Sequence, residues 1–161
     1  MVRISGWVAM TALTGMLLAG GATAQSTGSD PVYAAAQKVS KEIAWHETSV
    51  LAADFNCTGT VQFAILGTSL QEIVVAMFGP DLTQAPALLR FASDARNRQA
   101  AKIRLDDYTM SASEIAGIAG APPVGYRPSG ACHGVRLSDD SSEAAHIYWD
   151  HDNRRFDSWA Q

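Results

Sequence analysis

The chain has 161 residues, of which 47% are hydrophobic and 17% are charged, and its formal net charge is −4 at pH 7. That length favours one domain, and the composition excludes a disordered or fibrous chain. The acidic balance argues against a nucleic-acid-binding protein and against a polybasic membrane binder, because both need a basic surface.

The N-terminal segment, residues 1–24, has the pattern of a signal peptide. Arg3 supplies a positive start, an apolar run follows, and the segment ends in an Ala-Thr-Ala triplet of the kind that signal peptidase cleaves. The apolar run is short for a transmembrane helix, and no cysteine for lipid attachment stands at the cleavage point. We therefore expect cleavage before Gln25, a periplasmic or secreted location, no membrane attachment afterwards, and a single β-rich domain over residues 25–161.

Beyond this segment the chain predicts one helix followed by short strands. Asp30 and Pro31 form a helix start, and apolar residues at helical spacing continue to about residue 43. Short apolar or β-branched runs bounded by turn residues predict strands. These runs cover residues 61–66, 70–78, 88–91, 101–105, 134–137, 145–149 and 154–159. With a weak helix over residues 110–119, the prediction is a mainly β domain of antiparallel hairpins with a short N-terminal helix.

The last two predicted strands are rich in aromatic residues on both sides of the tight turn at 150–153. These residues are Tyr148, Trp149, Phe156 and Trp159. Residues on opposite strands of a hairpin meet as cross-strand pairs. We expect such aromatic pairs here, with at least two of the rings in the core and with Trp45 closing the same core.

The two cysteines, Cys57 and Cys132, both lie in the exported part of the chain. An oxidising compartment favours a disulfide between them, which would close a loop worth about 4 kcal/mol in the chain-entropy model. The alternatives are a metal site with two thiolates, although the close-spaced ligand pairs typical of zinc are missing, and free thiols.

The turn before the first predicted strand has the shape of a calcium loop with oxygen ligands. Asp54, Asn56 and Thr58 place oxygen atoms at alternate positions, and Gly59 permits a sharp bend. Asp54 is the only charged residue of the set, because Thr58 and Gln62 stand where further acids would help. The alternative is a tight turn in which Asp54 and Asn56 bond to backbone amides. We expect no cofactor, with calcium binding weakly or not at all.

Residues 54–67 read Asp-Phe-Asn-Cys-Thr-Gly-Thr-Val-Gln-Phe-Ala-Ile-Leu-Gly. This stretch resembles a degenerate FG-GAP/VCBS repeat, the calcium-loop-plus-hairpin unit of β-propellers. Residues 132–159 resemble the end of small exported proteobacterial proteins with one such unit, a group that includes vestigial-propeller proteins similar to i-type lysozyme inhibitors. Some of these proteins serve as immunity proteins against secreted peptidoglycan hydrolases. The resemblance implies a vestigial β-propeller-like fold and an inhibitor function, although the Ser-Gly-x-x-Tyr signature of several inhibitor families is incomplete after Ser129 and Gly130.

The sequence shows no signature of an enzyme. It contains neither a Gly-x-Ser-x-Gly elbow nor a phosphate-binding glycine loop. Ser129 and His133 could pair, but no acid to orient the histidine can be identified. His146 and His151 are five residues apart across a strand and a turn, which does not suit a shared metal. We therefore predict a binding protein.

The loop over residues 120–130 is the strongest functional candidate. It contains three prolines, which reduce the entropy lost on binding, and it carries a tyrosine and an arginine, both favoured at interface hot spots. We predict that Tyr126, Arg127, Ser129 and Gly130 bind a partner. The alternative is an ordinary surface connection.

These observations predict a periplasmic binding protein that inhibits a peptidoglycan hydrolase, as a lysozyme inhibitor or immunity protein does. The 120–130 loop would enter the acidic active-site cleft, where Arg127 would be complementary in charge. The expected partner is a secreted or periplasmic lytic enzyme, with no role for nucleic acid. The alternative function is a calcium- or glycan-binding module without an enzyme target.

Overall fold

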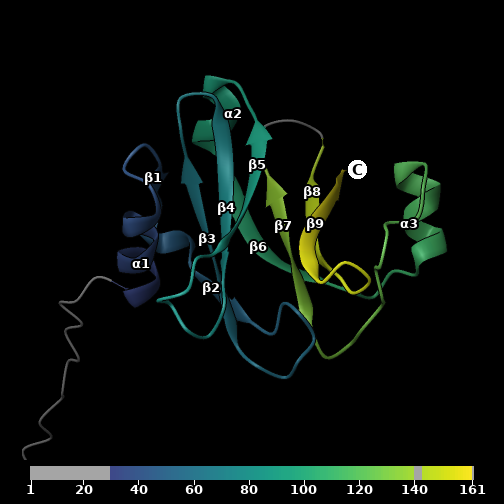
Figure 1. Ribbon diagram of the computed structural model, residues 1–161. Coiled ribbons are helices and arrows are strands. Elements are labelled where there is room, and N and C mark those ends of the chain that lie inside the picture. The colour runs from purple at the N-terminus through teal and green to yellow at the C-terminus, as the bar shows by residue number, and fades with distance from the viewer. Residues whose placement is uncertain (1–29, 140–142, 161) are drawn as a thin grey trace, which may run out of the picture.

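The computed structural model describes residues 30–139 and 143–160, and Figure 1 shows the arrangement of their helices and strands. The predicted signal peptide and its cleavage point before Gln25 lie outside the described residues. Within them, no helix is long and apolar enough to cross a membrane. The predicted fold class is confirmed, because the described chain is mainly β and forms two antiparallel sheets.

The chain enters the fold through helix α1, Pro31–Val39. As predicted, Asp30 caps this helix, and its carboxylate accepts the Val32 N–H at 2.8 Å. The helix ends at Val39, earlier than predicted, because Ser40 takes an extended backbone conformation. Its buried face packs on the outer face of the first sheet, at the left of Figure 1.

The first sheet, sheet A, surrounds the predicted hairpin. Its elements are β1 (Ala44–Trp45), the 3-10 turn η1 (Glu47–Ser49), β2 (Leu51–Ala53), β3 (Gln62–Thr68), β4 (Glu72–Phe78) and β5 (Ala87–Ala92). The order is β1-β3-β4-β5, and β2 also pairs with β3. The β3–β4 hairpin has the predicted position, with Thr68 opposite Ile73 next to the turn.

The second sheet, sheet B, is formed by the C-terminal half of the chain. Its strands are β6 (Lys102–Asp107), β7 (His133–Ser138), β8 (Ala145–Asp150) and β9 (Arg155–Ala160), in that order. Two helices lie along its connections, α2 (Ala95–Ala100) and α3 (Ala112–Ala119). Helix α3, predicted as a weak helix, has a capping box between Ser111 and Glu114. Helix α2 was not predicted, and Asp94 caps it by accepting the Asn97 N–H at 2.8 Å.

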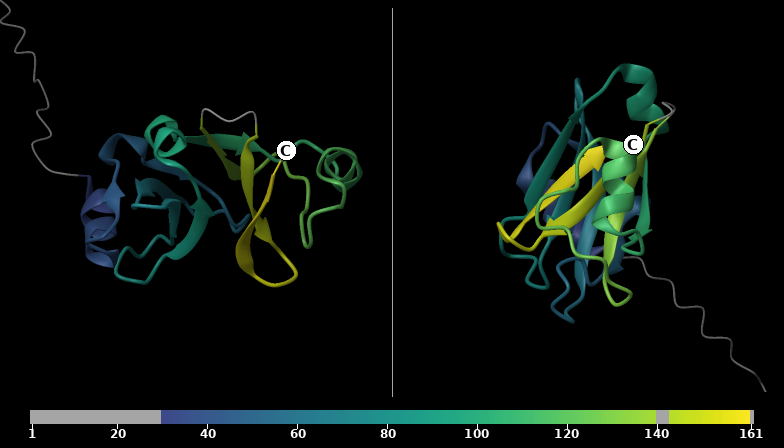
Figure 2. Two further views of the ribbon diagram at one scale, coloured as in Figure 1. Left: turned by 90° about the horizontal axis from the view of Figure 1, so that it is seen from above. Right: turned by 90° about the vertical axis from the view of Figure 1, so that its right-hand side faces the viewer.

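The main hydrophobic core lies between the two sheets, which Figure 2 shows in two further views. Sheet A contributes residues such as Leu66 and Val75, and sheet B contributes residues such as Leu137 and Ile147. A second core lies between α1 and the other face of sheet A. Trp45 belongs to this second core, so the prediction that it closes the core of the tail hairpin was wrong.

The tail hairpin β8–β9 carries one of the expected aromatic pairs. Trp149 and Phe156 are opposite each other, with their ring centres 5.0 Å apart and an edge-to-face orientation. Tyr148 and Trp159 have different partners: Tyr148 is opposite Asp157, and Trp159 is opposite His146. The alternation of a strand places Tyr148 and Trp159 on the face of sheet B that points away from sheet A.

The predicted disulfide between Cys57 and Cys132 is confirmed. It joins the turn between β2 and β3 to the residue just before β7, so it fastens sheet A to sheet B. Both cysteines of the sequence are used in this bond, which excludes the alternatives of free thiols and of a thiolate metal site.

Candidate binding loop and its anchors

The 120–130 loop is attached to β8 and to the β8–β9 turn by hydrogen bonds to its backbone carbonyls. The His151 N–H donates to the Gly125 carbonyl at 3.0 Å, and the Tyr148 hydroxyl donates to the Val124 carbonyl at the same distance. Gly125 has a φ of +65°, and a Cβ atom at this position would overlap the carboxylate of Asp150. Glycine is therefore the residue that allows the loop to approach the turn this closely.

The carboxylate of Asp150 organises the turn against which the loop packs. Asp150 is fully buried and accepts the backbone N–H groups of Asp152 and Asn153 at 2.9 and 3.0 Å. The Asn153 side-chain amide donates to the same carboxylate at 2.6 Å, and this bond is the main cause that lowers the pKa of Asp150. The buried negative charge is thus compensated by hydrogen bonds that also set the shape of the turn.

Tyr126 points inward and anchors the loop. Its hydroxyl donates to the Met110 carbonyl at 3.0 Å. Its ring packs edge-to-face on Tyr108 and on Tyr148, with ring centres 5.4 and 5.8 Å apart. Burial raises the pKa of Tyr126 to about 12. In this structure Tyr126 packs against the domain, whereas the prediction made it a direct contact to a partner.

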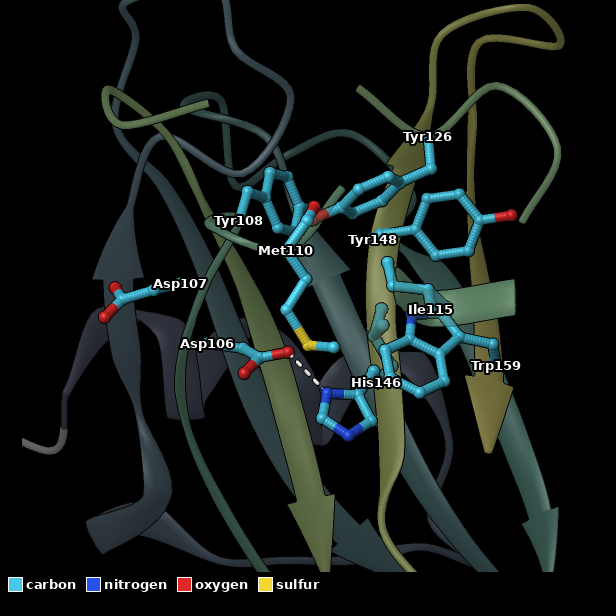
Figure 3. Close-up of a pocket in the computed structure, with 10 residues that line it drawn as sticks. Asp106, Asp107, Tyr108, Met110, Ile115, Tyr126, His146, Tyr148 and Trp159 are labelled. Atoms are coloured by element: carbon cyan, nitrogen blue, oxygen red, sulfur yellow. Dashed lines mark hydrogen bonds and ion pairs between the residues drawn. The ribbon is translucent and has the colours of Figure 1, made fainter. Parts of the chain in front are cut away.

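The three tyrosines surround a small cavity between the loop, helix α3 and the outer face of sheet B (Figure 3). Its volume of about 40 Å³ suits a few water molecules, since one water needs roughly 10–15 Å³ of such space. Its lining residues include Tyr108, Ile115 and Trp159. The cavity is too small for an organic ligand, so recognition at this point of the molecule would use the outer surface of the loop.

Arg127 is one of the exposed residues of the loop. Its side chain is 64% exposed, and it pairs at 3.3 Å with Asp152, whose side chain is 59% exposed. Such an exposed pair contributes little to stability, so Arg127 can exchange this partner for another at small cost. Gly130 is also exposed, whereas Ser129 is half-buried and its N–H donates to the Tyr108 carbonyl at 2.9 Å. The four predicted contact residues therefore divide into an inward anchor (Tyr126), a second anchor (Ser129) and two outward residues.

The proposed calcium turn is closed by its own hydrogen bonds. One oxygen of Asp54 accepts the Thr58 N–H at 3.1 Å and the other accepts the Gly59 N–H at 2.6 Å. The Thr58 hydroxyl donates to the Asn56 side-chain oxygen at 2.6 Å. Asp54 therefore bonds to backbone amides as in the tight turn named above as the alternative, whereas Asn56 bonds to a side-chain hydroxyl. Among the described residues, no three His, Cys, Asp or Glu side chains are grouped in a way that could hold a metal ion.

The anchors of the loop could not be identified in the sequence. Gly125 and Asp150 are 25 positions apart, and only the fold brings them into contact. Gly134 is a similar case, because a Cβ atom there would lie 2.6 Å from the ring of Tyr108. No family model, curated protein or solved structure matches the chain.

Proposed function

We propose that the protein is an exported binding protein that inhibits a peptidoglycan hydrolase through the 120–130 loop. The observation that carries the proposal is the rigid attachment of this loop, which holds Arg127 outward while Tyr126, Gly125 and Ser129 are fixed to the domain. A loop that is already ordered loses little conformational entropy on binding. The resemblance to vestigial-propeller lysozyme inhibitors supports the choice of target.

The chemistry of the target also suits the outward arginine. Most glycoside hydrolases cleave with two carboxyl groups placed on either side of the scissile bond. In the complex, a carboxylate of the enzyme would take the place of Asp152 and accept charge-assisted hydrogen bonds from Arg127. Val124, whose exposed fraction is 61%, would add apolar contact beside it.

The experiment that tests the proposal is inhibition of a lytic enzyme encoded next to this protein or isolated with it from the same compartment. Arg127→Ala is expected to weaken inhibition by about 2 kcal/mol, because a hot-spot arginine is removed, and to leave the melting temperature almost unchanged. Full inhibition by the Arg127→Ala variant would remove the loop from the mechanism. If no hydrolase binds at micromolar concentration, a calcium- or glycan-binding module becomes the better interpretation.

Two glycine variants test whether the position of the loop matters. Gly125→Ala should displace the loop, because a Cβ atom there overlaps Asp150 and the backbone φ is positive. Gly79→Ala is the matched control, since Gly79 lies outside the loop and its Cβ would meet nothing within 4 Å. We expect Gly125→Ala to lose inhibition and Gly79→Ala to retain it. Equal inhibition by both variants would contradict a role for the rigid loop.

A further inference from the structure

One row of side chains crosses the outer face of sheet B, and none of its members belongs to the 120–130 loop. Arg104 of β6 is directly opposite Arg136 of β7, and Arg136 is directly opposite His146 of β8. The neighbouring residues Ile103 and Leu137 belong to the core between the sheets, so the alternation of the strands turns the row outward. Directly opposite residues have Cβ atoms roughly 4.5–5.5 Å apart, which brings the three side chains within reach of one ligand.

The two arginines of the row have no paired carboxylate in the part of the chain that the structure describes. Neither Arg104 nor Arg136 forms an ion pair there, although like charges directly opposite each other destabilise a sheet. The nearby Asp106 carboxylate is used by His146, whose Nδ1 lies 2.7 Å from it. In addition, Arg136 Nε and His146 Nε2 are buried atoms without a hydrogen-bond partner. Such atoms reduce stability unless something satisfies them.

His146, the member of the row on β8, is held in a fixed orientation. Its side chain is only 9% exposed, and its ring stacks on Trp159 with the ring centres 4.0 Å apart and the planes 4° from parallel. Figure 3 shows one ring nitrogen reaching Asp106 while the other points away from the tyrosines. Asp106 thus fixes the orientation of the ring, with Nδ1 toward the carboxylate.

We propose that this row binds an oxyanion, either a carboxylate or a phosphate group of a ligand. The guanidinium groups of Arg104 and Arg136 supply paired N–H donors of the geometry that suits both oxyanions. The half-buried Arg136 side chain turns toward the anion as it binds, so that its unpartnered Nε also donates to the anion, and the His146 ring next to Arg136 reports the binding. This site does not depend on hydrolase inhibition, because none of the three residues belongs to the 120–130 loop.

The test is a titration of the isotope-labelled protein with sodium phosphate and, separately, with sodium succinate at constant ionic strength. Side-chain NMR signals of Arg136 Nε and of the His146 ring are expected to shift and saturate at millimolar concentration. Saturation with phosphate alone identifies a phosphate site, and saturation with succinate alone identifies a carboxylate site. If neither anion shifts these signals, the proposal is overturned.

Arginine variants show whether the row itself binds the anion. Arg104→Gln and Arg136→Gln should each weaken binding about tenfold, the effect of one lost charge-assisted hydrogen bond. Arg90→Gln is the matched control, because Arg90 is an exposed arginine of sheet A that pairs with Glu72 at 2.7 Å. Without anion, Arg104→Gln should melt no lower than the unsubstituted protein, since it relieves the repulsion with Arg136. Equal binding by all three variants would assign the signals to a general charge effect and overturn the site.

Discussion

The two sheets of this protein differ in how much of their faces is covered by other parts of the chain. Sheet A is covered on both faces, by sheet B on one side and by α1 on the other, and its strand β4 is buried at every position from Ile73 to Phe78. Sheet B is covered by sheet A on one face, and its other face is covered only in part, by the 120–130 loop and helix α3. Its outer face carries polar and aromatic residues that alternate with core residues, as in Arg136 and Leu137 or His146 and Ile147.

This difference separates residues that stabilise the fold from residues that are available for recognition. A strand with two covered faces has no position left for a functional side chain, because each side chain is needed for packing. A strand with one covered face can carry charged side chains on its other face without removing apolar side chains from the core. Both proposed sites, the 120–130 loop and the row from Arg104 to His146, lie on sheet B.

The largest expected effect is that of removing the disulfide, which links the two sheets. Replacing both Cys57 and Cys132 by serine should lower the free energy of unfolding by about 4 kcal/mol, because the bond closes a loop of 75 residues. Denaturant unfolding of the oxidised protein and the double variant measures this difference. A loss below about 1 kcal/mol would mean that the two sheets hold together by their shared core alone.

Neighbouring residues within one strand provide the next test. In β3, Ile65 faces α1 and Leu66 faces sheet B, and both are almost fully buried. Ile65→Ala and Leu66→Ala should each cost about 3 kcal/mol. In β7 the corresponding pair should differ, with about 3 kcal/mol for Leu137→Ala and less than about 1 kcal/mol for Arg136→Ala. Equal losses within both pairs would show that the outer face of sheet B is structural after all.

The smallest effect concerns the tyrosine cluster that attaches the loop to sheet B. Tyr126→Phe removes the hydrogen bond to the Met110 carbonyl and should cost about 1 kcal/mol near neutral pH. Burial raises the pKa of Tyr126 and of Tyr148 to about 12, above the ordinary value of about 10. The stability that these groups contribute is therefore complete below pH 10 and is lost as the pH rises toward 12.

The free energy of unfolding, measured across this alkaline range in the unsubstituted protein and in Tyr126→Phe, tests whether stability falls as the pH rises. The variant should lose less stability than the unsubstituted protein as the pH rises, because it has one fewer buried hydroxyl that titrates. An identical pH dependence would indicate that Tyr126 is already exposed to solvent before unfolding.

The parts of the fold that could be predicted depend on local signals. Asp30 and Pro31 mark a helix start, and short apolar runs between turn residues mark the hairpins β3–β4 and β8–β9. The strands β1 and β2 are two and three residues long, too short for an alternating pattern to show. Helix α2 has six residues and buries none of them, so the only signal for it is the cap at Asp94.

The sequence by itself determined the mainly β class and the disulfide, because strand patterns and the pairing of the two cysteines in the sequence need no knowledge of distant contacts. Only the tertiary structure decided that Tyr126 points inward while Arg127 points outward, since both side chains suit either environment in an irregular loop. It also decided that Gly125 lies against Asp150 and that Arg104, Arg136 and His146 form one row. These contacts arise from strand register and from sheet packing, which join residues that are far apart along the chain.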